Sequence, residues 1–444
     1  GEIVKKVKSK ELKPEEVTAA ALDNIQELDP KYFAWVVYGN EEILARMRAQ
    51  QKEICSSNAR LLEDIPVGVK DIFNTSDFPT QMGSPLWKNF TPGNDARVVF
   101  HLKRQGALIM GKTITAEFAV HALNETLNPW DITKTPGTSS SGSAVAIALG
   151  MVPVALGTQT AGSIIRPASF CGVYGCKPSF GLIPRTGTLK TTDTLDTIGF
   201  FAVHLEDLRR IFDSMRVFGG NYPISNSALS DLTRQKKPEG RPWRVCLART
   251  HTWENAPAYA REALEKFMTK LSNQKGVEVN DAALPKEMRE AHAVHETIYD
   301  KALSYYFQRE YKKSDLVSKT MNELIQKGSE IDVAQYKKAL QVQVELIQKM
   351  DVFLQDFDAV ISLSTAGEAP LRDVSESPDP ALMWTLTHLP TVSAPVFRSP
   401  SAIPFGIQIA ARKYNDYLLF EFLSYLQAQG LIPSRSNQPS HLLY

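Results

Sequence analysis

The chain has little cysteine, no excess of charge of either sign and no long apolar run. Its 444 residues include only 4 Cys, too few for a disulfide scaffold, and their spacing matches neither a CxxC redox pair nor a zinc site. We therefore expect reduced thiols and a cytoplasmic protein. Lys and Arg total 50 against 49 Asp and Glu, so the net charge of +1 creates no broad field for nucleic acid or anionic lipid.

Apolar stretches are too short for a membrane helix, which needs roughly 18 to 20 continuous apolar residues. The nearest candidate, residues 144–157, is interrupted by Pro153 and predicts a buried helix followed by a strand. The chain opens on Gly1 rather than Met, so a removed targeting peptide is left open. Apolar residues make up 43% and charged residues 22%, which is typical of a globular protein.

Helical and strand patterns alternate along the chain, which favours an α/β fold with a parallel or mixed sheet. Helices are predicted at about 14–33, 40–53, 96–105, 205–217, 256–273 and 416–429, with further helices filling 286–354. Strands are predicted at about 65–73, 107–111, 243–248, 358–363 and 404–411. The loop at about 235–242 is the only plausible domain boundary in this pattern, and it is short enough to be an insertion.

A run of Gly, Ser and Thr at residues 136–143 differs in composition from the rest of the chain. Such runs are usually flexible linkers. Here a strongly apolar helix follows at once, which favours a loop where the backbone approaches a ligand closely. A phosphate-binding loop would end in Gly-Lys-Ser or Gly-Lys-Thr, and this sequence lacks that ending.

A second turn of small residues places Ser163 directly after Ala-Gly and between apolar segments. Ser163 is a candidate nucleophile whose neighbouring N–H groups would suit an oxyanion, although a tight turn at a strand end fits equally well. None of the 8 His lies in either small-residue segment, and no Gly-x-Ser-x-Gly elbow is present. A Lys held neutral by burial is the other possible base, and Lys70 lies in an apolar strand. A structural ion pair between Lys70 and Asp71 is the alternative.

Lys70, the 136–143 run and the Thr-Ala-Gly-Ser run at 160–163, in this order, resemble the amidase signature family of serine hydrolases. The similarity covers nearly the whole chain and includes two closing strands beside the site, at 389–393 and 404–408. It implies an α/β fold with a mixed β-sheet core covered on both faces by α-helices. It also implies a single amidase domain over residues 1–444, with a catalytic core at about 60–215 and 355–430 and a variable helical region at about 250–355 on the substrate side.

The resemblance implies a catalytic triad in which Lys70 is the base, Ser139 follows a cis peptide bond and Ser163 is the nucleophile. In the implied acyl transfer, neutral Lys70 takes the proton of Ser139 as Ser139 takes that of Ser163, which attacks an amide carbonyl. No metal or cofactor is implied. The implied oxyanion hole consists of the N–H groups of Thr160, Ala161, Gly162 and Ser163.

Two positions depart from the family's commonest nucleophile motif. Gln159 stands where that motif has Asp, and Arg166 sits one place later than its Arg. These departures move the chain away from the A-type subunit of the tRNA-dependent amidotransferase and favour a free-standing amidohydrolase acting on a small carboxamide. The alternatives are a glutamine-hydrolysing amidotransferase subunit that supplies ammonia to a partner, and an inactive binding protein.

Predictions for the substrate pocket are less specific. We expect substrate contacts at Thr138, Gln159 and Arg185, although Arg185 fits a structural ion pair equally well. The pocket is expected to draw on 78–87, 117–124 and the helices after Ala291, including the aromatic side chains of Tyr299, Tyr305 and Tyr306. A helical Tyr is more often simple packing. The expected partner is a small-molecule amide, with no nucleic acid and no membrane, and a homodimer is left open.

Overall fold

A computed structural model describes residues 1–54, 60–374 and 376–439 of the chain. These residues form an 11-stranded sheet in the order β1-β3-β2-β4-β6-β5-β10-β11-β9-β7-β8. The strands are β1 (Trp35–Tyr38), β2 (Pro66–Lys70), β3 (Leu108–Thr113), β4 (Val154–Gln159), β5 (Tyr174–Lys177), β6 (Thr197–Ala202), β7 (Trp243–Leu247), β8 (Val277–Asn280), β9 (Ala359–Leu363), β10 (Thr391–Arg398) and β11 (Pro404–Ala410).

The sheet is mixed, as the sequence predicts. Strands β3, β2 and β4 run parallel to one another, and so do β9, β7 and β8. The neighbours from β4 through β6, β5, β10 and β11 to β9 are all antiparallel. Strands from the first and last parts of the chain therefore share one sheet.

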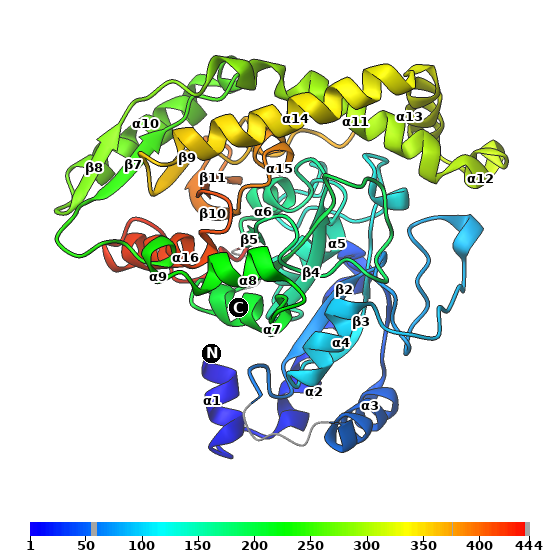
Figure 1. Ribbon diagram of the computed structural model, residues 1–444. Helices are drawn as coiled ribbons and strands as arrows, with labels where there is room; N and C mark the ends of the chain where they lie inside the picture. The colour runs from blue at the N-terminus through cyan, green and yellow to red at the C-terminus, as the bar shows by residue number, and fades with distance from the viewer. Residues whose placement is uncertain (55–59, 375, 440–444) are drawn as a thin grey trace.

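Helices flank this sheet, which confirms the predicted class of fold (Figure 1). They are α1 (Glu2–Lys8), α2 (Pro14–Tyr32), α3 (Glu41–Ile54), α4 (Arg97–Arg104), α5 (Ser141–Ala148), α6 (Ile165–Cys171), α7 (Asp207–Met215), α8 (Pro223–Ser230), α9 (Leu232–Gln235), α10 (Ala258–Ser272), α11 (Ala291–Tyr306), α12 (Gln308–Tyr311), α13 (Lys319–Glu330), α14 (Val333–Phe353), α15 (Leu382–Leu386) and α16 (Asp416–Ala428).

Two short central helices, α5 and α6, follow the two small-residue segments. α5 packs against β4 and β2, and α6 packs against β10 and β11. Every residue of α5 is buried, and small residues allow this close approach. A Cβ at Gly142 would lie only 2.4 Å from the carbonyl oxygen of Ala34. The small residues of 136–143 thus have a packing role beside any chemical one.

The predicted helical stretch 286–354 is divided into separate helices. Helices α11, α13 and α14 pack together and form a layer along one side of the molecule, at the top of Figure 1. Ser318 caps the start of α13 by accepting from the N–H of Met321, and Asp332 caps α14 by accepting from that of Gln335. Such side-chain caps replace the helical partners missing at a helix start, so each cap begins a new helix.

Strands β1, β5, β6 and β8 are not among the sequence predictions. Each is 4 to 6 residues long. Periodicity is hard to read in so few residues, and β5 and β6 are buried at every position, which removes the alternation that marks a strand. Among the described residues, no helix combines the length and apolar character needed to cross a membrane.

Candidate active site

Lys70 is the last residue of β2, a strand buried along its whole length. Its side chain is fully buried, and its Nζ hydrogen-bonds three hydroxyl oxygens: Ser139 Oγ at 2.7 Å, Ser140 Oγ at 3.0 Å and Thr158 Oγ1 at 2.9 Å. Burial lowers the pKa of Lys70 well below its usual value, because the charged form loses its hydration. The carboxylate of the adjacent Asp71 binds Lys112 instead, at 3.0 Å.

Ser139 follows a cis peptide bond to Thr138. The residue before this pair, Gly137, has a φ of +84°, and a Cβ there would lie 2.9 Å from the Cα of Pro167. Only glycine fits both conditions without strain. Arg166 donates from Nη2 to the carbonyl oxygen of Thr138 at 2.6 Å, so the loop that carries Ser139 is tied to the start of α6.

Ser163 lies on the loop between β4 and α6, and only 6% of its surface is exposed. Among the described residues, no hydrogen bond joins Ser163 to Ser139, so the structure links Lys70 to Ser139 but not Ser139 to Ser163. The N–H groups of the four predicted oxyanion-hole residues, Thr160, Ala161, Gly162 and Ser163, donate no hydrogen bond to any described residue. Their role in binding an oxyanion stays a prediction.

Gln159 holds the loop between β4 and α6, residues 160–164, which we call the nucleophile loop after the predicted role of Ser163. Its Oε1 accepts from the N–H groups of Ile164 and Ile165, at 2.8 and 2.9 Å, and its Nε2 donates to Thr385 Oγ1 at 2.9 Å. The side chain is completely buried. Its polar atoms therefore bind the protein itself, whereas we predicted a contact with substrate.

Arg166 forms a buried cluster with two carboxylates. Its guanidinium lies 2.6 Å from Asp379 and 2.8 Å from Glu376, and burial raises the pKa of both acids. Asp379 also packs against the nucleophile loop, since a Cβ at Gly162 would overlap its carboxylate. Neither acid belongs to a recognisable motif, and both lie more than 200 residues from Arg166 along the chain, so the sequence gives no signal for them.

A cavity of about 430 Å³ opens beside this cluster and the loop that carries Ser139. Its lining includes Thr138, Ala161, Arg166, His121, Arg372 and Asp379. The predicted pocket segment 117–124 thus contributes to it, through His121 and Leu123, whereas 78–87 does not. The His121 side chain is exposed and lines this cavity, and desolvation of its ring together with the nearby Arg166 lowers its pKa below the usual value, so this imidazole is neutral at pH 7.

A second cavity, of about 340 Å³, includes Thr158, Thr160, Arg185 and Asp196 in its lining. Arg185 lines it but donates to the carbonyl oxygens of Thr192, Asp193 and Asp196, and it lies over the ring of Phe180. Arg185 makes no ion pair among the described residues, and its predicted contact with substrate stays a prediction.

The three predicted aromatic residues of α11 differ in position. Tyr299 is buried and stacks on His295, with ring centroids 5.6 Å apart. Tyr305 is 68% exposed, and Tyr306 donates its hydroxyl to Asp193. None of the three lines either cavity.

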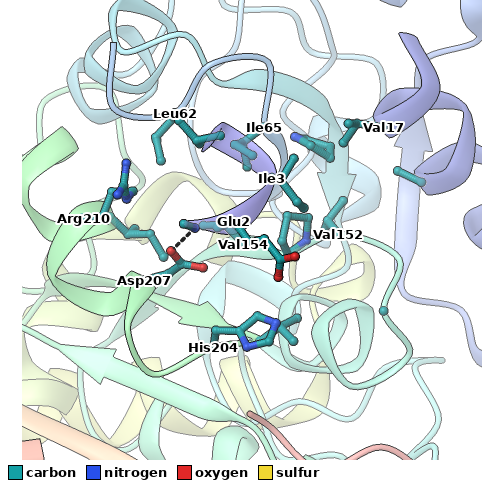
Figure 2. Close-up of a pocket in the computed structure, with 18 of the residues that line it drawn as sticks. Glu2, Ile3, Val17, Leu62, Ile65, Val152, Val154, His204, Asp207 and Arg210 are labelled. Atoms are coloured by element: carbon teal, nitrogen blue, oxygen red, sulfur yellow. Dashed lines mark hydrogen bonds and ion pairs between the residues drawn. The ribbon is translucent and has the colours of Figure 1, made fainter. Parts of the chain in front are cut away.

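A larger cavity, of about 600 Å³, is lined by residues of α1, α2, α7 and the start of β4. Figure 2 shows its lining, with Ile3, Val17 and Asp207 among the labelled side chains. Ile3, Val17, Val152 and Val154 form its apolar part, and Asp207 pairs there with the amino group of Gly1. None of Lys70, Ser139 and Ser163 lines any of the three cavities. The 430 Å³ cavity is the one that Thr138, the neighbour of Ser139, lines together with Ala161.

Comparison with known proteins places the chain in a family. A family model described as Amidase matches residues 16–420. The A-type subunit of the glutamyl-tRNA(Gln) amidotransferase of Cyanothece sp. is 28% identical, over 95% of both chains. The peptide amidase of Stenotrophomonas maltophilia superimposes with a TM-score of 0.80 at 22% identity, covering 99% of this chain and 97% of the other. The 6-aminohexanoate cyclic dimer hydrolase gives a TM-score of 0.82 at 21% identity, covering 99% and 98%.

The chain belongs to the amidase family, because the family model matches most of its length. The two solved structures share its fold. The proteins that this chain resembles include one named as an amidase and one named as an amidotransferase subunit. Membership of the family therefore does not by itself separate amide hydrolysis from the amidotransferase function.

Proposed function

We propose that this chain hydrolyses the C–N bond of a small carboxamide through an acyl-enzyme on Ser163. The observation that carries the proposal is the environment of Lys70. Its Nζ is fully buried and hydrogen-bonds hydroxyl groups, and no carboxylate among the described residues pairs with it to stabilise the ammonium form. We therefore assign Lys70 the role of the base.

The proton path runs from Ser163 to Ser139 to Lys70. A neutral amine keeps a lone pair, which accepts the hydroxyl proton of Ser139 while Ser139 Oγ accepts that of Ser163. Ser163 Oγ then attacks the amide carbonyl carbon. The N–H groups of Thr160, Ala161, Gly162 and Ser163, which donate to no described residue, bind the oxyanion that develops on the carbonyl oxygen.

Breakdown of the tetrahedral intermediate reverses the proton path. Ser139 gives its proton to the leaving nitrogen as the C–N bond breaks, and Lys70 returns the stored proton to Ser139. Water then attacks the acyl-enzyme by the same route and releases the carboxylic acid. Every proton taken up in the first half is returned, so the triad ends as it began. The cavity beside Thr138 and Ala161 is the space we assign to the substrate.

A second candidate is a glutamine-hydrolysing amidotransferase subunit that supplies ammonia to a partner. The specific observation in its favour is that curated relatives carry an amidotransferase name and match this chain over nearly their full length. On the relatives' names alone it is the better supported reading. The neutral Gln159 at the nucleophile loop is the feature of this chain that favours the free-standing enzyme.

Ammonia release by the purified chain tests both candidates. The substrates are glutamine and a panel of aliphatic, aryl and amino-acid amides, with Ser163→Ala as the blank. Turnover of several amides that is lost in Ser163→Ala supports the free-standing enzyme, and turnover of glutamine alone supports the amidotransferase reading. A folded chain that releases no ammonia from any of them contradicts both.

A further inference from the structure

Two residues outside every predicted motif hold the carbonyl groups of the nucleophile loop. His295, on α11, donates from Nε2 to the carbonyl oxygen of Thr160 at 2.8 Å. Thr385, on α15, donates from Oγ1 to the carbonyl oxygen of Ala161 at 2.6 Å. Both donors are buried, and both come from helices more than 100 residues away along the chain.

The direction of each hydrogen bond is fixed by chemistry. A carbonyl oxygen only accepts, so His295 carries its proton on Nε2. Gln159 Oε1 accepts two backbone N–H groups, so its Nε2 must be the donor to Thr385 Oγ1. The hydroxyl of Thr385 then has its own proton left for the carbonyl of Ala161. Burial lowers the pKa of His295 to about 4, so the imidazole is neutral at pH 7.

Holding a carbonyl also fixes the N–H group of the next residue. A trans peptide unit is planar, and its C=O and N–H point in opposite directions. The contact from His295 therefore sets the direction of the Ala161 N–H, and the contact from Thr385 sets that of the Gly162 N–H. Neither of these two N–H groups donates a hydrogen bond to any described residue.

We infer that His295 and Thr385 are positioning residues for the oxyanion hole, acting through the Thr160 and Ala161 carbonyl groups. The inference rests on the proposed function, because it assumes that the loop's N–H groups receive an oxyanion. Preorganised donors stabilise developing charge because they need not reorient during the reaction. Losing either contact should weaken transition-state binding more than ground-state binding.

The test measures how fast a fluorophosphonate phosphonylates Ser163, because its phosphoryl oxygen occupies the oxyanion position as the bond forms. Thr385→Val removes the hydroxyl at nearly constant shape. Loss of a whole oxyanion donor costs about 10²- to 10³-fold, so we expect a loosened donor to slow phosphonylation about 10- to 100-fold. The concentration for half-maximal rate should stay nearly constant. Thr385→Ser, which keeps the hydroxyl, should restore most of the rate.

Thr387→Val is the matched control. Thr387 is also fully buried, but its hydroxyl donates to the carbonyl of Met383 in its own helix and does not touch the loop. A wild-type rate in Thr385→Val, or an equal loss in Thr387→Val, overturns the inference. Failure to label Ser163 in the wild-type chain overturns the proposed function as well, and so the two failures are distinguishable.

His295 supplies an independent pair of variants if Thr385→Val does not fold. His295→Leu removes the donor, and His295→Gln places an amide Nε2 near the position of the imidazole Nε2. We expect His295→Leu to slow phosphonylation and His295→Gln to recover it in part. Equal rates in the two variants would show that the contact with Thr160 carries no positioning role.

Discussion

Lys70 and Lys112 lie on adjacent parallel strands, one register position apart, and neither has exposed surface. Their partners differ. Lys112 binds the carboxylate of Asp71 at 3.0 Å, together with the hydroxyl of Thr80 and two backbone carbonyls. Among the described residues, Lys70 binds three hydroxyls and no carboxylate. Burial lowers the pKa of both; Asp71 opposes this shift at Lys112 by direct contact, whereas Asp196 opposes it at Lys70 without forming an ion pair.

The difference separates a structural Lys from a catalytic candidate. A buried cation with a carboxylate partner stays charged and becomes part of the fold. A buried Lys among hydroxyl groups can lose its proton, and those hydroxyls can exchange protons with it. The Gly/Ser/Thr composition of the surrounding loops supplies such neighbours, so burial alone does not identify the base.

The largest expected effect is on activity in Lys70→Met, which keeps the length of the side chain and removes the base. General-base catalysis is typically worth 10²- to 10⁴-fold, and we expect a loss of about 10⁴-fold in kcat/KM because the proton path ends at this residue. The hydroxyl groups that contact Lys70 are neutral, so the substitution leaves no unpaired charge buried, and the midpoint of thermal unfolding should change little. A variant that keeps more than a tenth of the activity would contradict the role of Lys70 as base.

Lys112→Met should lose stability rather than the catalytic base, the reverse of what we expect for Lys70→Met. It leaves the carboxylate of Asp71 buried without its cation, and breaking a buried pair costs about 3–5 kcal/mol of unfolding free energy. Urea denaturation measures this loss. The double variant Lys112→Met/Asp71→Leu should recover much of it. A stable Lys112→Met that is as inactive as Lys70→Met would remove the distinction between the two lysines.

Ser139→Ala tests whether Lys70 acts through a hydroxyl relay. We expect kcat to fall about 10²- to 10³-fold, less than in Lys70→Met, because Lys70 keeps Ser140 and Thr158 as partners and a water molecule can replace the missing hydroxyl. Steady-state kinetics on the best amide measures this. Unchanged kinetics would show that Ser139 carries no proton.

The smallest expected effect is on stability as a function of pH. The pKa of Lys70 is lower in the folded than in the unfolded chain, so above the folded-state pKa the unfolded chain binds more protons. Its contribution to stability therefore rises with pH, by at most about 1.4 kcal/mol per pH unit, until the unfolded-state pKa of about 10.4. We expect the unfolding free energy of wild type, relative to Lys70→Met, to increase from pH 7 to 10. A constant difference would place the pKa of Lys70 at its ordinary value.

Local features of the site could be predicted from the sequence. The apolar run around Lys70 predicts its buried strand, the first small-residue segment predicts a loop followed by an apolar helix, and the second predicts a turn. These inferences need only neighbours along the chain. Charge, burial and turn composition are all local properties of that kind.

Long-range contacts could not be predicted in this way. The carboxylates of Glu376 and Asp379 around Arg166, and the contacts of His295 and Thr385 with the nucleophile loop, join segments that are far apart in sequence. Nothing in the local pattern marks these residues, since each has an ordinary helical or loop context. The fold alone brings them to the site.

The most direct measurement is peptide-mapped mass spectrometry after fluorophosphonate treatment of wild type and Lys70→Met across a range of pH. A neutral Lys70 predicts an adduct on Ser163 in wild type that forms faster as pH rises, by up to about tenfold per unit below the pKa of Lys70. It also predicts little adduct in Lys70→Met at the same pH. Equal labelling of Ser163 in both proteins would contradict activation of the nucleophile by Lys70.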